Sequence, residues 1–235
     1  MSQLSSRLAT IADFVPRNAK ICDVGTDHGY LAIELSKNGK AKTVIATDIA
    51  EKPLANAAKN IKKAGVENIS LRLCNGLEAV KPEETDSVII AGMGGEVISG
   101  ILQKDSTVTA RKGVLLILQP TTSPEVLRRF LYKNGYIIIK EKAVYENNKL
   151  YSVMFVEFTG KKVQKDEFFY YVGLLTPQDD NSLMYIKKQL NRVQKCMISL
   201  ENIKEKRTDY IHYKSVFCGI TEYLKSFDGE HKNGI

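Results

Sequence analysis

The residues best suited to chemistry lie in one glycine-containing segment, DVGTDHGY at positions 23 to 30. Its two glycines allow a sharp backbone turn and close approach of a ligand to the main chain. They are spaced differently from the Gly-x-Gly-x-x-Gly pattern that binds a dinucleotide pyrophosphate. The carboxylates of Asp23 and Asp27 would repel a diphosphate, but they suit a ligand with an ammonium group, a ribose and a cationic centre. We therefore predict that Asp23, Gly25 and Thr26 bind S-adenosylmethionine.

Two further segments supply candidate ligands for the same molecule. Asp48 ends a second β-branched run and is followed by Ile49, and a carboxylate at such a position can accept both ribose hydroxyls. Capping of the next helix is the alternative role for Asp48. Asn75 and Gly76 follow the third run and place an amide and a flexible residue where an adenine edge can be read.

A third candidate segment is AGMGG at positions 91 to 95, which follows the fourth apolar run. In open α/β sheets, ligands bind at the carboxyl ends of the strands. Small residues around the single thioether of Met93 leave room there for a flat ring, so we include Gly92 and Met93 in the cofactor site. The alternative is that these glycines only pack against the start of a helix.

The elements that must position these residues alternate between short apolar runs and helix-like stretches. This alternation predicts an α/β fold, a mostly parallel sheet covered by helices on both faces. The predicted strands are residues 20–24, 43–47, 69–73, 87–91, 113–118, 136–144 and 151–158, and the predicted helices between them are 30–37, 52–64, 95–103 and 124–134. The turn at 146–149 is too short for a crossover helix and predicts that the last two strands form an antiparallel hairpin.

Helical patterns also flank this alternating region. Apolar residues from Leu4 to Val15 recur at helical spacing until Pro16. After residue 160 the pattern changes to two amphipathic runs joined by a charged stretch, which predicts an antiparallel, coiled-coil-like helical hairpin. We therefore divide the chain into a cofactor-binding domain, residues 1–160, and a helical domain, residues 161–235.

Basic residues concentrate on the first helix of this hairpin. The chain carries 34 Lys and Arg against 27 Asp and Glu, a net charge of +7, which indicates an anionic partner without identifying it. Four residues of this helix form a candidate RNA-binding strip, and Arg7 near the amino terminus is a fifth candidate. The strip consists of Lys187, Lys188, Arg192 and Lys195. Arg7 could instead reach into the cofactor cleft from the opening helix. A solvated surface is the alternative for all five residues.

Composition excludes several classes of protein. With 43% hydrophobic and 26% charged residues the chain is globular, and no apolar stretch approaches the ~20 residues of a membrane helix. No secretory signal is visible at the amino terminus, so we expect a cytoplasmic protein that contacts no membrane. The four cysteines are scattered singly, so we predict buried free thiols and no metal site. We expect a monomer.

Several of these segments together resemble the bacterial tRNA (adenine 22, N1) methyltransferase family, TrmK. The resemblance lies in DVGTDHGYL at 23–31, NGLE at 75–78, IAGMGG at 90–95 and LQP at 118–120, and the opening LSSRL at 4–8 is also similar. It covers nearly the whole chain, including the helical tail. It implies a class I, Rossmann-like methyltransferase fold with a seven-stranded sheet, S-adenosylmethionine as the cofactor and tRNA as the substrate.

The resemblance also implies a reaction. Adenine N1 carries its own lone pair, so in-line attack on a sulfonium methyl needs mainly correct positioning. A catalytic or base-orienting role is implied for Asp27, with helix capping as the alternative. His28 can contact the base or a phosphate, and Tyr30 can stack on adenine, but each also fits ordinary packing. N1 lies on the pairing edge of the base, so the tRNA must open locally.

Two other functions are compatible with the sequence. A class I methyltransferase acting on a small molecule or a protein would bind the cofactor without depending on RNA. A non-catalytic RNA-binding module would bind tRNA without turnover, although the acidic residues of the cofactor turn argue against this. The Asn-Pro-Pro-Tyr-type motif usual in methylation of an exocyclic amine does not follow the fourth run, which favours ring-nitrogen chemistry.

Overall fold

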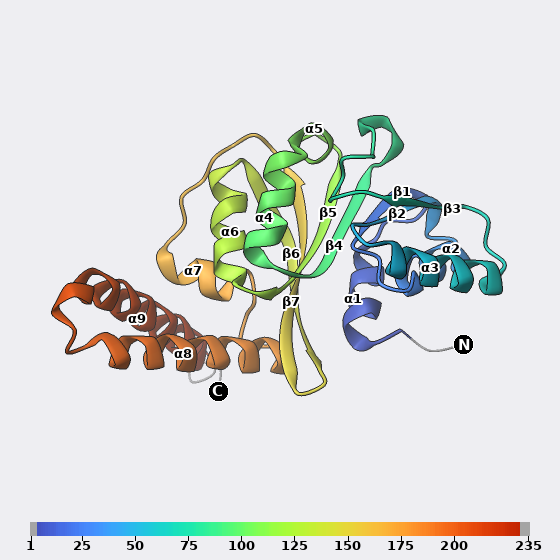
Figure 1. The fold of residues 1–235 in the computed structure, drawn as a ribbon. Helices are drawn as coiled ribbons and strands as arrows, with labels where there is room; N and C mark the ends of the chain where they lie inside the picture. Colours follow the sequence, from blue (N-terminus) through green and yellow to red (C-terminus); the bar gives the residue numbers. More distant parts are fainter. Residues whose placement is uncertain (1–3, 231–235) are drawn as a thin grey trace. The chain divides into compact units, whose positions relative to one another are not determined.

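A single seven-stranded sheet organises the first part of the chain (Figure 1). The structure, a computed structural model, describes residues 4 to 230. It divides into two compact units, Met1–Val163 and Gln164–Ile235. The sheet has the order β3-β2-β1-β4-β5-β7-β6. Its strands are β1 (Ala19–Val24), β2 (Ala41–Asp48), β3 (Ile69–Leu73), β4 (Ser87–Gly94), β5 (Leu115–Thr122), β6 (Tyr136–Glu146) and β7 (Lys149–Phe158).

The strand order reverses direction next to β1. From β1 the chain adds β2 and β3 on one side, and it then returns to add β4 and β5 on the other. All of these neighbours pair in parallel, so the carboxyl ends of β1, β2 and β4 share one edge of the sheet. Loops diverge at such a reversal and leave a crevice for a ligand. The predicted site residues lie at the ends of β1, β2, β3 and β4 and in the segments that follow them.

Helices cover both faces of this sheet (Figure 1). The helices α1 (Ser6–Phe14), α2 (Tyr30–Lys37) and α3 (Glu51–Ala64) cover one face, whereas α4 (Gly95–Lys104) and α6 (Pro124–Lys133) pack side by side on the other. Strands buried on both faces become continuously apolar, as in Val88, Ile89 and Ile90 of β4, which are fully buried. The short α5 (Ser106–Thr109) and a 3₁₀ turn (Pro82–Glu84) complete the unit.

The antiparallel β6–β7 hairpin closes the sheet. Its two-residue turn, Asn147-Asn148, has φ values of 49° and 58°, the left-handed pair that a tight hairpin turn requires and that asparagine tolerates. A fully buried ion pair joins α6 to the hairpin, because Arg128 Nη2 lies 2.6 Å from a carboxylate oxygen of Glu141. Ser152 of β7 donates to the same carboxylate. Several hydrogen bonds thus compensate for burial of these charges.

The second unit contains three helices, α7 (Glu167–Val172), α8 (Asp180–Leu200) and α9 (Arg207–Glu230), and a 3₁₀ turn (Lys204–Lys206). The helices α8 and α9 run antiparallel and pack along each other (Figure 1). Asp179 caps α8 by accepting a hydrogen bond from the Ser182 N–H at 2.9 Å. At Gly219 of α9, an added Cβ would lie 2.8 Å from Phe168 Cβ, so glycine permits α7 to approach closely.

The structure confirms the predicted fold class and corrects several details. The strand Ile69–Leu73 and the helix Tyr30–Lys37 have the predicted ends, and the other strands are one to four residues longer or shifted. The helices α5 and α7 were not predicted, because four and six residues are too few to show a helical period. All four cysteines are free, but the prediction that all are buried was wrong: Cys22 is buried, Cys74 and Cys196 are partly exposed, and Cys218 is exposed.

Candidate active site

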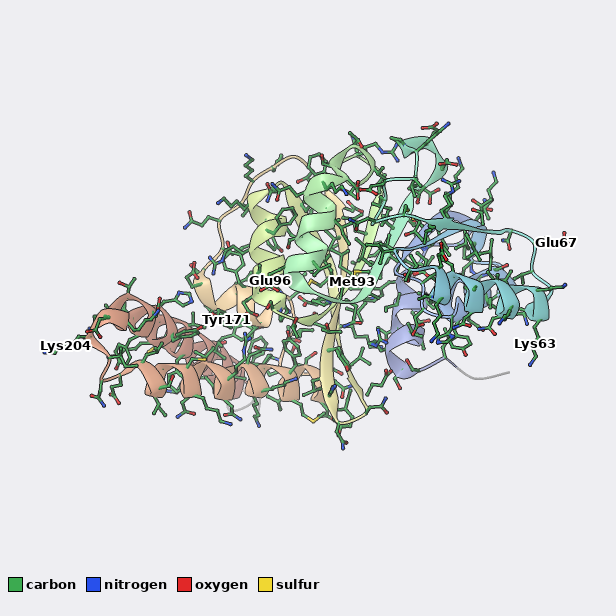
Figure 2. The ribbon with its side chains drawn as sticks, viewed as in Figure 1. Lys63, Glu67, Met93, Glu96, Tyr171 and Lys204 are labelled. Atoms are coloured by element: carbon green, nitrogen blue, oxygen red, sulfur yellow. The ribbon has the colours of Figure 1, made fainter. Side chains whose placement is uncertain are left out.

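A cavity of about 450 Å³ opens at the carboxyl edge of the sheet, within the first unit. This volume lies in the range of small-molecule sites. It is lined by Arg7, Leu8, Asp23, Gly25, Thr26, Asp27, Tyr30, Leu31, Asp48, Ala91, Gly92 and Met93. Figure 2 labels Met93, which lies where β4 leads into α4. Residues from α1, from the carboxyl ends of β1, β2 and β4, from the turn after β1 and from the start of α2 therefore meet in one site.

Asp23 is the buried carboxylate of this cavity. It ends β1 next to Val24 and is only 6% exposed. The Thr26 hydroxyl donates to Asp23 Oδ2 at 2.7 Å. Burial raises the pKa of Asp23 from 3.8 to about 6, the Thr26 hydrogen bond lowers it in part, and the nearby charge of Asp48 raises it again. A cationic ligand group beside Asp23 would stabilise its ionised form.

Gly25 lets the turn after β1 lie close to the end of β4. Gly25 has a φ of +74°, and an added Cβ would lie 2.4 Å from Met93 Cε, so the Met93 thioether lies directly over the β1 turn. The Thr121 hydroxyl donates to the Met93 carbonyl oxygen at 3.0 Å and fixes the backbone of this residue. The thioether is flexible, so the wall that it forms can adjust to a ligand.

Gly95 is a tighter contact and yields a prediction. An added Cβ would lie 2.1 Å from the Ser123 carbonyl oxygen, a backbone atom that cannot move aside cheaply. We expect Gly95→Ala to lower the free energy of unfolding by about 1–3 kcal/mol, because α4 must shift from the β5–α6 connection. Gly100→Ala is the matched control, since nothing lies within 4 Å of its added Cβ. That change should stabilise α4 by about 0.5–1 kcal/mol. Urea unfolding of both variants measures the contrast, and equal effects would contradict it.

Asp48 lies on the opposite wall from the β4 loop, at the end of β2. Its Oδ1 accepts a hydrogen bond from the Ala50 N–H at 2.9 Å, so it takes part in a local turn. The other carboxylate oxygen has no protein donor among the hydrogen bonds of the described residues and is available for a ribose hydroxyl. The turn and the ribose therefore do not compete for the same oxygen.

The remaining predicted cofactor-binding residues, Ile49, Asn75 and Gly76, lie beside the cavity and not in its lining. Ile49 is 72% exposed next to Asp48. Gly76 accepts a hydrogen bond from the Thr47 hydroxyl at 3.0 Å, and the Cys74 N–H donates to the Asp48 carbonyl oxygen at 3.0 Å. The segment that contains Asn75 thus borders the end of β2. It extends the site along the sheet edge, where its adenine-binding role remains a prediction.

The three predicted catalytic residues form one exposed cluster. The Asp27 side chain is 80% exposed and lies 3.2 Å from His28 Nε2. The rings of His28 and Tyr30 stack at 5.6 Å with an interplanar angle of 19°. Asp27 and Tyr30 line the cavity, whereas His28 does not. The amino cap of α2 is Gly29, without a side-chain hydrogen bond, so Asp27 does not cap this helix.

His28 also has an unusual backbone. Its φ of 59° lies in the left-handed region, which is costly for a residue with a side chain. The Asn60 side-chain amide of α3 donates to the His28 carbonyl oxygen at 2.9 Å and holds this turn. Such conformations persist only where the surroundings enforce them, and they cluster at functional sites.

Arg7 of α1, which lines the cavity, contacts β5 and the β6–β7 hairpin. Arg7 Nη1 donates to Gln119 Oε1 at 2.7 Å, and the Arg7 main-chain N–H donates to Glu146 Oε2 at 2.7 Å. Burial alone would raise the pKa of Glu146, but hydrogen bonds from Arg7 and Ser5 and the Arg7 charge hold it below its usual value. Arg7 was predicted to bind RNA or to reach into the cleft, and the structure places it in the cavity lining. No role was predicted for Gln119 or Glu146.

Three other lining residues were not predicted: Leu8, Leu31 and Ala91. Each is an apolar residue directly beside a predicted one in the chain or on the same helix face. Their proximity to Arg7, Tyr30 and Gly92 was the available signal.

The predicted basic strip lies in the second unit. Lys187, Lys188, Arg192 and Lys195 line one surface groove of about 530 Å³ on α8, together with Met184 and Asn191. The three lysines are exposed. The Arg192 guanidinium lies 5.4 Å from the centre of the Tyr171 ring, and the Tyr171 hydroxyl lies 3.2 Å from His212 Nε2. Figure 2 labels Tyr171. The four predicted cations thus share one face.

Comparison with known proteins is consistent with this geometry. Residues 4–154 match the sequence model of a methyltransferase domain family. The chain is 33% identical over 209 residues to the tRNA (adenine(22)-N(1))-methyltransferase of Bacillus subtilis (strain 168), covering 86% of this chain and 87% of that protein.

Solved structures are similar over both units. The B. subtilis M1A22 tRNA methyltransferase TrmK has a TM-score of 0.84 and 29% identity, covering 94% of this chain and 99% of that one. M. capricolum TrmK, solved in complex with S-adenosyl-homocysteine, has a TM-score of 0.79 and 28% identity, with coverage of 95% and 99%.

Proposed function

Because the chain belongs to the family of tRNA (adenine(22)-N(1))-methyltransferases, we propose that it transfers a methyl group from S-adenosylmethionine to N1 of adenine 22 in tRNA. The observation that carries this proposal is the acidic cavity at the reversal of strand order, with an aromatic and carboxylate cluster at its rim. The family resemblance predicted from the sequence is confirmed.

The cavity fits the cofactor chemically. Asp23 can pair with the ammonium group of the methionyl part, and Asp48 can accept hydrogen bonds from the ribose hydroxyls. Gly25 and Gly92 let the ligand approach the backbone between β1 and β4, with the Met93 thioether as an adaptable wall. When bound, S-adenosylmethionine supplies an electrophilic methyl group on a sulfonium centre. Methylation of N1 forms an N–C bond, breaks the S–C bond and leaves the adenine positively charged.

Asp27 is our candidate for the residue that stabilises or neutralises the positive charge on the methylated adenine. Its carboxylate lines the cavity and is 80% exposed, so a base can reach it. It can stabilise the developing charge by electrostatics and accept a proton from the exocyclic amine. The His28 ring lies 3.2 Å from the Asp27 carboxylate and leaves it exposed.

The stacked pair of His28 and Tyr30 supports a place for the target adenine. Tyr30 is 47% exposed although it lines the cavity, so one face of the aromatic cluster is accessible. Stacking of a base on an aromatic side chain contributes about 1–3 kcal/mol. An adenine extruded from the tRNA stack can replace its lost stacking there.

The groove on α8 supports a role for the second unit in binding tRNA. Its lysines are flexible point charges that can pair with phosphates, and Arg192 is held over Tyr171. We propose that residues 161–235 form the tRNA-contacting domain and that Lys187, Lys188, Arg192 and Lys195 contact the RNA backbone. This proposal is independent of the catalytic roles.

A charge-matched comparison tests this surface. Replacing Lys187, Lys188 and Lys195 with Gln should weaken tRNA binding roughly tenfold or more near 0.1 M salt and reduce the salt slope by about three. The control replaces Lys204, Lys214 and Lys225, which are exposed lysines outside the groove of the same unit. Filter binding over a range of salt concentrations measures both triple variants. Equal losses would mean that only total charge matters.

The reaction is tested with labelled S-adenosylmethionine and unmodified tRNA. The RNA is digested after incubation, and the methylated nucleoside is identified by mass spectrometry. We expect 1-methyladenosine, and its loss when adenine 22 of the transcript is replaced by guanine. Label in protein, in a small molecule, or at another nucleotide would contradict the proposal.

The alternative of a small-molecule or protein methyltransferase is not favoured, because the similarity to tRNA methyltransferases extends through the helical unit. Among residues 4 to 230, no helix has the length and apolarity needed to cross a bilayer. In the same range, no group of three or more His, Cys, Asp or Glu residues is placed to hold a metal ion. We propose that the enzyme acts on tRNA in the cytoplasm, as a monomer.

A further inference from the structure

The side chains that line the cavity include more acidic groups than basic ones. Asp23, Asp27 and Asp48 are acidic, and Arg7 is the one cationic side chain among the lining residues in the described part of the chain. S-adenosylmethionine carries two cationic groups, the sulfonium and the ammonium, and a single anionic group, the methionyl carboxylate. The acids suit the cations and the ribose, but none of them suits the carboxylate.

We propose that Arg7 binds the methionyl carboxylate of S-adenosylmethionine, and that Gln119 and Glu146 are positioning residues that aim its guanidinium into the cavity. This inference rests on the proposed function, because it assigns a further ligand contact within the same site. It gives Arg7 a role in recognising the cofactor in place of the RNA.

Gln119 fixes one end of the guanidinium. Its side chain is fully buried at the end of β5. Its Oε1 accepts from Arg7 Nη1 at 2.7 Å and from the Gly92 N–H at 3.1 Å, while its Nε2 donates to the Pro120 carbonyl oxygen at 2.8 Å. Reversing the amide would place an N–H₂ group against two donors, so the network specifies one orientation. Gln119 thereby joins Arg7 to Gly92, near the end of β4, which also lines the cavity.

Glu146 fixes the helix that carries Arg7. It lies at the end of β6, and its carboxylate accepts from the Arg7 main-chain N–H in the first turn of α1. A carboxylate is favourable at a helix amino terminus. The same carboxylate lies 3.6 Å from Arg7 Nε. Both ends of the Arg7 residue are therefore held by groups far away in the sequence.

The remaining part of the guanidinium is available to a ligand. Arginine has five N–H donors. The described residues contact Nη1 and Nε, and they offer no hydrogen-bond acceptor to Nη2. The Arg7 side chain is 23% exposed, and its guanidinium lies 5.7 Å from the centre of the Tyr151 ring. A partly buried, oriented guanidinium is suited to paired hydrogen bonds with a carboxylate.

The test compares two ligands that differ by one group. S-adenosylhomocysteine keeps the carboxylate, whereas its decarboxylated analogue keeps only the adenosine and the amine. Calorimetry should show that the wild-type protein binds the first roughly tenfold to hundredfold more tightly. In Arg7→Gln this ratio should fall to about one. Arg7→Lys should retain part of the ratio, because its charge remains but its paired donors are lost.

Two more variants separate positioning from general damage. Gln119→Met keeps side-chain length but removes both acceptor contacts, and it should give an intermediate ratio. Arg17→Gln removes an exposed arginine outside the cavity lining, and it should leave the ratio unchanged. A merely structural role of Arg7 or Gln119 would weaken both ligands equally, so the ratio is the deciding quantity. Thermal unfolding without ligand checks that each variant folds.

Several results would overturn the inference. They are a wild-type ratio near one, an Arg7→Gln ratio equal to that of wild type, or normal ligand binding in Arg7→Gln with weakened tRNA binding. The last result would assign Arg7 to RNA. The proposed function fails separately if the wild-type protein binds S-adenosylhomocysteine but forms no 1-methyladenosine. The ligand ratio then still decides the role of Arg7.

Discussion

Asp27→Asn should lower kcat for tRNA methylation by about 10² to 10⁴. Asparagine has the size of aspartate, but it cannot accept a proton or stabilise a cationic adenine by charge. The Asp27 side chain is 80% exposed, it lies 3.2 Å from the ring nitrogen of a partly exposed histidine, and it does not cap α2. We therefore expect the unfolding temperature and the affinity for S-adenosylhomocysteine to remain close to those of the wild type.

The control for this prediction is Glu67→Gln, a removal of one acidic charge at an exposed position. Figure 2 labels Glu67 beyond the end of α3, away from Met93. Single-turnover methylation with saturating tRNA measures the chemical step in both variants. A rate for Asp27→Asn above a tenth of the wild-type rate would remove Asp27 from the mechanism, and a comparable loss in Glu67→Gln would show that the assay responds to net charge.

Asp23→Asn should change stability and cofactor binding in opposite directions. The pKa of Asp23 is about 6 in the folded protein and 3.8 in its unperturbed state, so burying the ionised form costs about 3 kcal/mol at neutral pH. Asparagine removes that cost and still accepts the Thr26 hydrogen bond through its Oδ1. The ligand-free variant should therefore be more stable by up to about 3 kcal/mol, while it binds S-adenosylhomocysteine roughly tenfold to hundredfold more weakly.

The pH dependence distinguishes this cause from others. Because the folded pKa exceeds the unfolded one, protonated Asp23 stabilises the folded protein, and this contribution is fully present below pH 3.8 and lost as the pH rises through 6. The wild type should be less stable than Asp23→Asn at pH 7, and this difference in the free energy of unfolding should disappear as the pH falls to 4. Other carboxyl groups titrate in both proteins, so the difference between their urea-unfolding curves isolates Asp23. A difference independent of pH would contradict the assignment.

The raised pKa of Asp23 should also make cofactor binding release protons. The ammonium group of the ligand favours the ionised form, so binding to the wild type near pH 6 should release about half a proton. Calorimetry in buffers of different ionisation enthalpy measures this release. Asp23→Asn should lose it, and an unchanged release would place the titrating group elsewhere.

The local part of this protein was predictable because it depends on residues that are neighbours in the sequence. The strand Ile69–Leu73, in which apolar and polar residues alternate, and the amphipathic helix Tyr30–Lys37 have the predicted ends. Asn147-Asn148 specified a tight turn and hence the antiparallel hairpin. Asp23, Gly25 and Asp27 share one turn, so their joint presence in one cavity required only that the turn lies at the strand edge.

The α8 surface was predictable for the same reason. Residues three and four apart share a helix face, and Lys188, Arg192 and Lys195 follow that spacing. Helix periodicity did not reveal α5 and α7, because four and six residues contain too little of a period. It also could not show that Arg192 lies over Tyr171, since that contact depends on the packing of α7.

The sequence by itself thus determined the order of the elements, the acidic cofactor turn and the basic helix face. Only the tertiary structure raised the pKa of Asp23, because this pKa depends on burial by the assembled sheet. Only the tertiary structure brought Arg7 to Gln119 and Glu146, which are 112 and 139 positions away. Local preferences act over a few residues, whereas burial and long-range hydrogen bonds exist only after the strands and helices have packed.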